Sequence, residues 1–513
     1  MTNFEVLKEK CSKLGIGFID EIDALNIDRA LAFSYPSGLI KKHKIIPYEK
    51  ANECIFWLVA NPLDSRVVSV ISSISQDGFK LVLAKSEQIE RYIETVYSEH
   101  ATEAAISELN SIKSDSESAL AEGLLAGADA SSNPAVRLVD SIIKEAILER
   151  ASDVHIEPFE KSVKVRFRID GDLRHRAEFA REAYAAVATR IKIMSGLNIA
   201  QRRNAQDGRI DMRVGGIDYD LRISTLPTVF GEKFAIRILD KSSFNLSRQD
   251  VGFDEEENAL IDKMLLHPHG IILLTGPTGC GKSTTLYSFL REVNNPKVNI
   301  VTVEDPVEYT MEGVNQTQVN TKANLTFAGA LRAILRQDPD VIMIGEIRDE
   351  ETASIAVRAA ITGHLVFSTL HTNDAPGAIV RLQDMGVPDY LISDATVGII
   401  AQRLVKKLCP ACKEKHISTE SEMKLLKIRT PTEIYTPKGC GYCGFSGYKG
   451  RCAVHEILYV DDKLKSAILT EKSIDALRKI AIDGGMTPLE DACKKLVLKG
   501  ETSTEELINL GLN

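Results

Sequence analysis

The chain has 513 residues, a net charge of −9 at pH 7, 44% hydrophobic residues and 26% charged residues. This composition is typical of folded globular proteins, and no apolar run approaches the roughly 18 residues that a membrane span needs. The acidic balance argues against a nucleic-acid motor, whose binding groove is usually basic.

The N-terminal region is predicted to be a small mixed domain covering residues 1–98. Its beginning lacks the apolar core of an export signal, so we expect a cytoplasmic protein. Two strands, 55–60 and 79–84, and a helix, 86–97, are predicted there. Residues 99–133 are rich in Ala, Ser, Glu and Gly. They offer too little apolar surface to offset the entropy lost on ordering, which predicts a flexible linker that is partly helical at most.

A second domain is predicted for residues 134–241, opening with a helix over 135–150. Apolar and charged residues then alternate over 163–171, which is typical of a strand in a sheet with one solvated face. Two further strands each carry an arginine near their centre, Arg222 and Arg237. We therefore expect an α+β domain.

Residues 252–513, after a short linker at 242–251, alternate between strand and helix patterns and are predicted to form an α/β domain. Within it, an apolar strand at 271–275 leads into the pattern G-x-x-x-x-G-K-S and a helix over 284–292. This is the phosphate-binding loop of P-loop NTPases, in which backbone N–H groups and a helix N-terminus face phosphate. We expect Lys282 to reach the β- and γ-phosphates and Ser283 to bind Mg²⁺. The expected nucleotide-binding residues of this loop are Gly276, Pro277, Thr278, Gly279, Cys280, Gly281, Lys282, Ser283 and Thr284.

Two acidic segments follow, each after an apolar strand. The first contains Glu304 and Glu308, and either could polarise the attacking water, unless the segment is only a solvated acidic turn. In the second, Asp340 precedes its strand and Glu346 follows it. Because only a group at the strand's end can reach Mg²⁺ beside Ser283, Glu346 is the better candidate for the acidic residue of this segment that acts on the metal.

Two histidines, His364 and His371, bracket the next short strand. A histidine at a strand end can sense a γ-phosphate by hydrogen bonding, although a single histidine is more often structural. Arginines can stabilise a transferring phosphoryl group from another domain. For Arg222 and Arg237, however, surface ion pairs remain the alternative.

Two C-x-x-C pairs, Cys409 with Cys412 and Cys440 with Cys443, lie in an insert at about 405–452. Four thiolates suit tetrahedral Zn²⁺ and leave no position for water, which predicts a structural zinc site rather than a redox dithiol.

The ordered series G-P-T-G-C-G-K-S-T-T-L-Y, T-V-E-D-P-V-E-Y, D-P-D-V-I-M-I-G-E-I-R-D and T-G-H-L-V-F-S-T-L-H-T, with the four cysteines, resembles the secretion ATPases of type II secretion and type IV pilus assembly. The similarity covers about residues 134–513. It implies a RecA-like ATPase domain preceded by a PAS-like sheet domain. It also implies a homo-hexameric ring with ATP bound between the two larger domains.

Carried over by motif, the resemblance implies that Glu308 is the catalytic glutamate, Glu346 the Walker B glutamate, and His364 and His371 the histidine pair. Arg222 and Arg237 would close on the nucleotide. The N-terminal domain would dock on an inner-membrane platform protein, which makes the ATPase peripheral to the bacterial inner membrane.

We expect an ATPase that drives pseudopilus assembly in type II secretion, with ATP, Mg²⁺ and Zn²⁺ as ligands and no nucleic-acid partner. Pilus extension or a DNA-uptake pseudopilus is the alternative within the family. A nucleic-acid translocase and a non-hydrolysing nucleotide-gated scaffold are the alternatives outside it.

Overall fold

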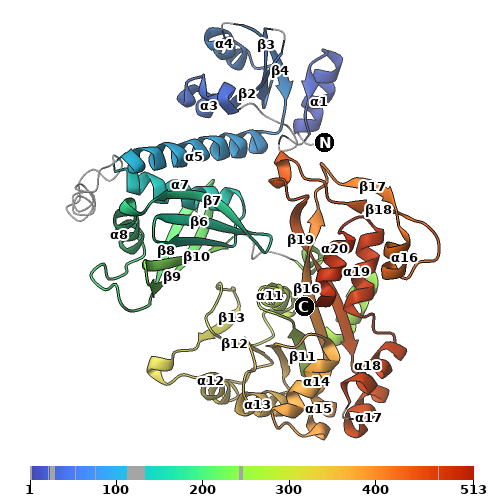
Figure 1. The fold of residues 1–513 in the computed structure, drawn as a ribbon. Coiled ribbons are helices and arrows are strands. Elements are labelled where there is room, and N and C mark those ends of the chain that lie inside the picture. The colour runs from blue at the N-terminus through green and yellow to red at the C-terminus, as the bar shows by residue number, and fades with distance from the viewer. Residues whose placement is uncertain are drawn as a thin grey trace. The chain divides into compact units, whose positions relative to one another are not determined.

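The computed structural model describes residues 3–20, 22, 29–51, 53–75, 77–111, 133–241, 247–471 and 473–512. The chain forms two compact units: the first takes residues 1–242 and the short segment 440–445, and the second takes residues 243–439 and 446–513 (Figure 1). Most of the first predicted linker, residues 112–132, and part of the second, 242–246, lie outside the described residues.

The N-terminal domain is built on a four-stranded sheet in the order β1-β4-β3-β2. Neighbouring residues of β3 point to opposite faces, so Trp57 and Leu58 enter separate hydrophobic cores on the two sides of the sheet. Both predicted strands are present, as β3 and β4. The strands are β1 (Gly17–Phe18), β2 (Ile45–Ala51), β3 (Cys54–Val59) and β4 (Gly78–Leu83), and the helices are α1 (Asn3–Lys13), α2 (Arg29–Phe33), α3 (Ser37–His43) and α4 (Ser65–Ile74).

Helix α5 (Ser86–Ser111) begins where a helix was predicted but continues to Ser111, into the stretch that we expected to be a linker. The physical reason lies in α7 (Pro134–Leu148), because Ala105 and Leu109 of α5 are buried in one core with Leu138 and Ile142 of α7. Alanine favours the helix, and these few apolar side chains find a partner that the local sequence does not reveal.

The second domain is a six-stranded antiparallel sheet in the order β7-β6-β5-β10-β9-β8. Every second residue of β6 is buried, whereas Arg166 and Arg168 are partly exposed, which confirms the predicted sheet with one solvated face. The apolar face packs against α7 and α8. The elements are β5 (Asp153–Pro158), β6 (Ser162–Ile169), β7 (Asp172–Ala180), a 3₁₀ turn (Arg181–Ala183), α8 (Tyr184–Met194), β8 (Gln206–Val214), β9 (Ile217–Thr228) and β10 (Gly231–Asp240).

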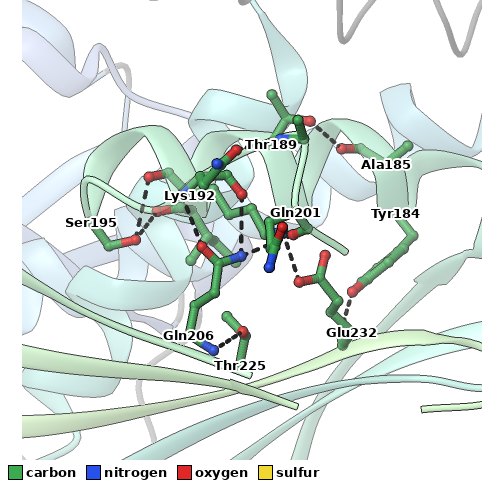
Figure 2. Close-up of polar contacts among 12 residues, drawn as sticks. Tyr184, Ala185, Thr189, Lys192, Ser195, Gln201, Gln206, Thr225 and Glu232 are labelled. Atoms are coloured by element: carbon green, nitrogen blue, oxygen red, sulfur yellow. Dashed lines mark hydrogen bonds and ion pairs between the residues drawn. The ribbon is translucent and has the colours of Figure 1, made fainter. Parts of the chain in front are cut away.

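A buried lysine ties α8 to this sheet (Figure 2). Lys192 is 1% exposed, and its Nζ lies 2.7 Å from Oε1 of Glu232 and donates to the main-chain oxygen of Gln201 at 2.6 Å. The Tyr184 hydroxyl donates to the main-chain oxygen of Glu232, and Gln206 Nε2 donates to the same Gln201 oxygen at 2.9 Å. The buried charge is thus paired and hydrogen-bonded, as a stable interior requires.

The second unit is an α/β domain with a seven-stranded sheet in the order β13-β12-β14-β15-β11-β16-β19, which confirms the predicted class. Its strands are parallel except for β19, which is antiparallel to β16. The strands are β11 (Gly270–Thr275), β12 (Ile300–Glu304), β13 (Val314–Gln318), β14 (Val341–Ile344), β15 (Leu365–Leu370), β16 (Thr396–Leu408) and β19 (Tyr448–Tyr459).

Helices cover both faces of this sheet (Figure 1), so its central strands are buried throughout and mostly apolar. Leu273 belongs to the core on one face and Leu274 to the core on the other. The helices before the cysteine insert are α9 (Arg248–Val251), α10 (Glu255–Leu265), α11 (Lys282–Val293), α12 (Phe327–Ile334), α13 (Glu350–Ile361), α14 (Ala375–Asp384) and α15 (Asp389–Ala395).

The cysteine insert contains a two-stranded hairpin, β17 (Glu414–Ile417) and β18 (Glu433–Thr436), with α16 (Glu420–Leu426) between its strands. Leu426 and Ile434 of this region pack on the last two helices, α19 (Leu489–Leu498) and α20 (Thr504–Leu512). The two helices before them are α17 (Asp462–Thr470) and α18 (Ile474–Asp483). Among the described helices, none has the length and apolar character needed to cross a membrane.

Candidate functional site

The predicted phosphate loop, Glu346 and His371 lie where the strands of the seven-stranded sheet end, at the carboxyl ends of its parallel strands. We call this side of the sheet the phosphate edge. Strands β11, β14 and β15 are parallel, and Thr275 pairs with Leu370 at their carboxyl ends. The phosphate loop follows β11, Glu346 follows β14 and His371 follows β15. Open α/β sheets bind ligands at this edge.

The phosphate loop joins β11 to α11, which begins at Lys282, two positions earlier than predicted. Gly276, Gly279 and Gly281 have φ values of 144°, 80° and 90°. A Cβ at Gly276 would lie 2.4 Å from the main-chain oxygen of Gln402, so the close approach requires glycine. Ser283 and Thr284 are exposed in the first turn of α11, where the helix end favours anions.

Lys282 is a buried cation whose hydrogen bonds go to neutral groups. It is 8% exposed, and Nζ donates to the main-chain oxygens of Gly276 at 2.7 Å and Pro277 at 3.0 Å. Burial lowers the pKa of Lys282, and no carboxylate of the described residues forms an ion pair with it. A buried ammonium under a ring of turned backbone is a donor set that fits a polyphosphate.

Glu346 lies beside His371, as their positions after neighbouring strands require. Oε2 of Glu346 is 3.3 Å from Nε2 of His371, and Oε1 forms an ion pair with Arg348. The hydrogen bond from Arg348 to Glu346 raises the pKa of the Arg348 guanidinium. The Glu346 side chain remains 14% exposed. Glu346 and His371 therefore form a polar pair at the phosphate edge.

Glu304 and Glu308, both considered for the water-polarising role, occupy different environments. Glu304 ends β12 and is 3% exposed. Its carboxylate accepts hydrogen bonds from Thr302 Oγ1 at 2.6 Å, from Gln316 Nε2 at 3.1 Å and from the Tyr287 hydroxyl. Burial and the neighbouring Glu304 carboxylate raise the pKa of Tyr287. Glu308 is partly exposed in the loop that follows. This difference favours Glu308 over Glu304.

His364 and Asp340 lie at the opposite side of the sheet, where the parallel strands begin. His364 precedes β15, and its Nδ1 is 2.9 Å from the main-chain oxygen of Ala359. Asp340 precedes β14, and its carboxylate accepts the Asn299 N–H at 2.7 Å. A strand of six residues spans about 20 Å. The structure therefore brings His371 to the phosphate edge of this unit but does not bring His364 there.

Arg222 and Arg237 lie in the first unit, directly opposite each other on β9 and β10. Nε of Arg237 donates to Asp153 at 3.2 Å. The sequence analysis missed Arg209. This residue lies on β8, directly opposite Arg222 on β9, and forms an ion pair with the buried Asp220. Three arginines thus lie side by side across three strands. The alternation of apolar and polar residues around Arg209 was the available signal.

Gln402 and Arg403 are two further residues that the sequence analysis did not identify. They lie on β16, just past the point where Thr275 of β11 pairs with Ala401. Gln402 Nε2 donates to the main-chain oxygen of Cys280 at 2.7 Å and so supports the phosphate loop. The sequence signal for this pair was two polar residues within an apolar run. It indicates a role at the phosphate loop only once β16 is known to lie beside β11.

Cys409, Cys412, Cys440 and Cys443 come together, with their sulfur atoms within 4.8 Å of one another. The Sγ atoms of Cys440 and Cys443 are 3.9 Å apart. Tetrahedral Zn–S bonds of about 2.3 Å place sulfur atoms about 3.8 Å apart. The four thiols therefore fit a closed zinc site in which all ligands come from the chain.

Comparisons with known proteins agree with this geometry. Residues 128–509 match the family described as "Type II/IV secretion system protein", and residues 14–103 match the MshEN domain. The type II secretion system protein E of Pseudomonas aeruginosa is 50% identical over 379 residues, covering 74% of this chain and 75% of that protein.

Two other relatives span more of this chain. The type II secretion system protein E of Klebsiella pneumoniae is 41% identical, covering 93% of this chain and 96% of the relative. The type IV pilus assembly ATPase PilB of Thermus thermophilus is also 41% identical, covering 92% of this chain and 54% of that protein. The solved ATPase DotB of Legionella pneumophila is 20% identical with a TM-score of 0.56, over 73% of this chain and 95% of DotB, which shows a shared fold.

Proposed function

The chain belongs to the type II/IV secretion system protein family, and on that premise we propose that it is the ATP-hydrolysing motor of a type II secretion system. The observation that carries the proposal is Lys282, a buried cation whose hydrogen bonds among the described residues go to phosphate-loop carbonyls, at the edge that also holds Glu346 and His371. This set of groups suits phosphoryl transfer, where catalysis is mostly positioning and charge stabilisation.

Each residue at the edge has a proposed role. Lys282 and the loop N–H groups would hold the phosphates, and Ser283 would supply a hydroxyl to Mg²⁺. Glu308 orients and polarises the attacking water, because Glu304 is already held by three donors. Glu346 would lie on the side of the site that faces the metal. His371 would lie on the side that faces the γ-phosphate. ATP bound with Mg²⁺ would supply the phosphoryl group, and the chain's own residues would orient it.

ATP turnover by the purified full chain tests this proposal. We expect Glu308→Gln to abolish most turnover while ADP binding stays within about threefold of wild type, because the side chain acts on water rather than on the phosphates. Glu304→Gln is the matched control for loss of a carboxylate. Unchanged turnover in Glu308→Gln would refute the assignment of the water-orienting role.

The larger assembly is also part of the proposal. A homo-hexamer would let Arg222 and Arg237 close on the nucleotide, since an arginine can act from another domain or subunit. The N-terminal domain would bind the cytoplasmic part of an inner-membrane platform protein, which would make the motor peripheral to that membrane. Measurement of the molecular mass with and without ATP tests the ring. The docking is tested by comparing how tightly the platform protein binds residues 1–111 and the full chain.

The cysteine cluster is proposed to hold a structural zinc ion in the insert. Metal analysis of the purified chain tests this directly, with one zinc per chain expected. A Cys440→Ser variant should lose the metal. A wild-type chain that carries no zinc would contradict the proposal.

Pilus extension is the second candidate, favoured by the PilB relative that covers 92% of this chain. Deletion of the gene in its own host separates the two. Loss of protein secretion with pili retained supports type II secretion, and loss of pili with secretion retained supports pilus extension.

A further inference from the structure

Arg403 on β16 is a buried arginine whose hydrogen bonds go to neutral oxygens. It is 7% exposed, and it donates to the main-chain oxygen of Gln402 at 3.3 Å, to that of Asn373 at 3.0 Å and to Oδ1 of Asn373 at 3.1 Å. No ion pair to Arg403 forms among the described residues, and burial lowers its pKa. A buried guanidinium normally requires a charged partner, so its retention calls for a role.

On one side, Arg403 supports the phosphate loop. Gln402 Nε2 donates to the main-chain oxygen of Cys280, and Gln402 Oε1 accepts from Thr285 Oγ1 in the first turn of α11 at 2.8 Å. A Cβ on Gly276 would be 3.1 Å from Nη1 of Arg403. The backbone of the loop therefore packs directly on the Gln402–Arg403 pair.

On the other side, Arg403 holds the segment 371–373, which carries His371. The N–H of Thr372 donates to Thr275 Oγ1 at 2.8 Å, at the end of β11. Asn373 is held by the two bonds from Arg403. Thr372 is thus tied to the end of β11 and Asn373 to Arg403, while His371 lies next to Glu346.

We propose that Arg403 is a positioning residue for ATP hydrolysis, an inference that rests on the proposed function. Its planar guanidinium contacts both the residues that support the phosphate loop and the segment 371–373. These contacts would keep His371 and Glu346 at a fixed distance from the bound phosphates. Lysine carries its three donors on a single nitrogen and cannot place them as the two Nη atoms of the planar guanidinium do. A displacement of about 1 Å in such a site can lower the rate by about 100-fold.

The test compares Arg403→Gln, Arg403→Lys and Asn373→Ala in the full chain. We expect Arg403→Gln to lower kcat by about tenfold or more, while the KM for ATP and the Kd for ADP stay within about threefold, since no phosphate-binding group is removed. Arg403→Lys should recover part of kcat. Asn373→Ala removes only the bond to Oδ1 and keeps the bond to the main-chain oxygen, so it should lower kcat less than Arg403→Gln does. The double variant should be no slower than Arg403→Gln alone, because both changes act on one link.

Arg478→Gln is the matched control. It removes a half-exposed arginine that pairs with Asp374, one residue beyond the segment, and should leave kcat within about threefold of wild type. The proposal is overturned by unchanged kcat in Arg403→Gln, by a rise in KM and Kd without loss of kcat, or by equal losses in Arg403→Gln and Arg478→Gln. A wild-type chain without ATPase activity would refute the proposed function together with this inference, whereas an active wild type matched by Arg403→Gln would refute this inference alone.

Discussion

Two buried lysines, one in each unit, illustrate how the same side chain serves different purposes. Lys192 on α8 is 1% exposed and its ammonium lies 2.7 Å from the carboxylate of Glu232. Lys282 at the start of α11 is 8% exposed and bonds to two backbone oxygens. Lys192 has its counter-ion within the fold, whereas the environment of Lys282 is ready for an anion from outside.

This difference has an energetic meaning. A buried ion pair is close to neutral for stability as a whole, but removal of one partner leaves an uncompensated charge. A buried lysine without a counter-ion lowers the stability of the fold, and groups of this kind are concentrated at functional sites. We therefore expect changes at Lys192 to alter stability and changes at Lys282 to alter activity.

The largest effect is expected from Lys282→Ala. ATP turnover should fall by about 1,000-fold or more, which corresponds to at least ~4 kcal/mol of transition-state stabilisation. ADP should no longer raise the melting temperature of the variant, while the unliganded melting temperature should not fall. A large loss of unliganded stability would show that Lys282 is a structural lysine like Lys192.

The converse change is Lys192→Met, which leaves Glu232 buried without a partner. We expect the free energy of unfolding of the first unit to fall by about 3–5 kcal/mol, measured by denaturant unfolding. Turnover per folded molecule should be unchanged. Lys192→Met combined with Glu232→Leu should regain most of the stability, because the uncompensated charge is then gone.

The two candidate carboxylates extend the comparison within one unit. Glu304 is held by three donors, so Glu304→Gln should lower stability by about 1–3 kcal/mol through a mismatched buried donor. Its turnover per folded molecule should fall far less than that of Glu308→Gln. A larger loss of turnover in Glu304→Gln would reverse the proposed assignment.

The smallest effect is expected from His364→Ala, measured beside His371→Ala. His371 contacts Glu346 at the phosphate edge, and its loss should lower kcat by about tenfold. His364 bonds to the main chain at the opposite edge, so its loss should change kcat by less than about threefold in the unit described. Equal losses would show that a second subunit brings His364 to a phosphate site.

Much of the phosphate edge could be predicted from the sequence because its signals are local. The strand, the glycine turn, Lys282 and the helix lie within one short stretch, and the order of acidic and histidine segments follows the order of parallel strands. The rule that favoured Glu346 over Asp340 also applies to the two histidines, because His364 precedes β15 and His371 follows it. The sequence analysis did not apply the rule to them, and the structure shows the separation.

Other features depended on partners distant in sequence. The extension of α5 to Ser111 depended on the apolar core that it shares with α7, in which Ala105 and Leu109 are buried. Arg209 gained meaning from its place opposite Arg222 across the β8–β9 pair.

The sequence by itself determined the chemistry of this protein, since turn geometry, phosphate-binding residues and cysteine spacing are properties of short segments. Only the tertiary structure decided which residues share an edge. It separated His371 from His364, distinguished Glu308 from Glu304, and placed Gln402 and Arg403 beneath the phosphate loop. The physical reason is that strand order and register bring together residues more than 100 positions apart, such as Cys280 and Gln402, and no local pattern encodes that pairing.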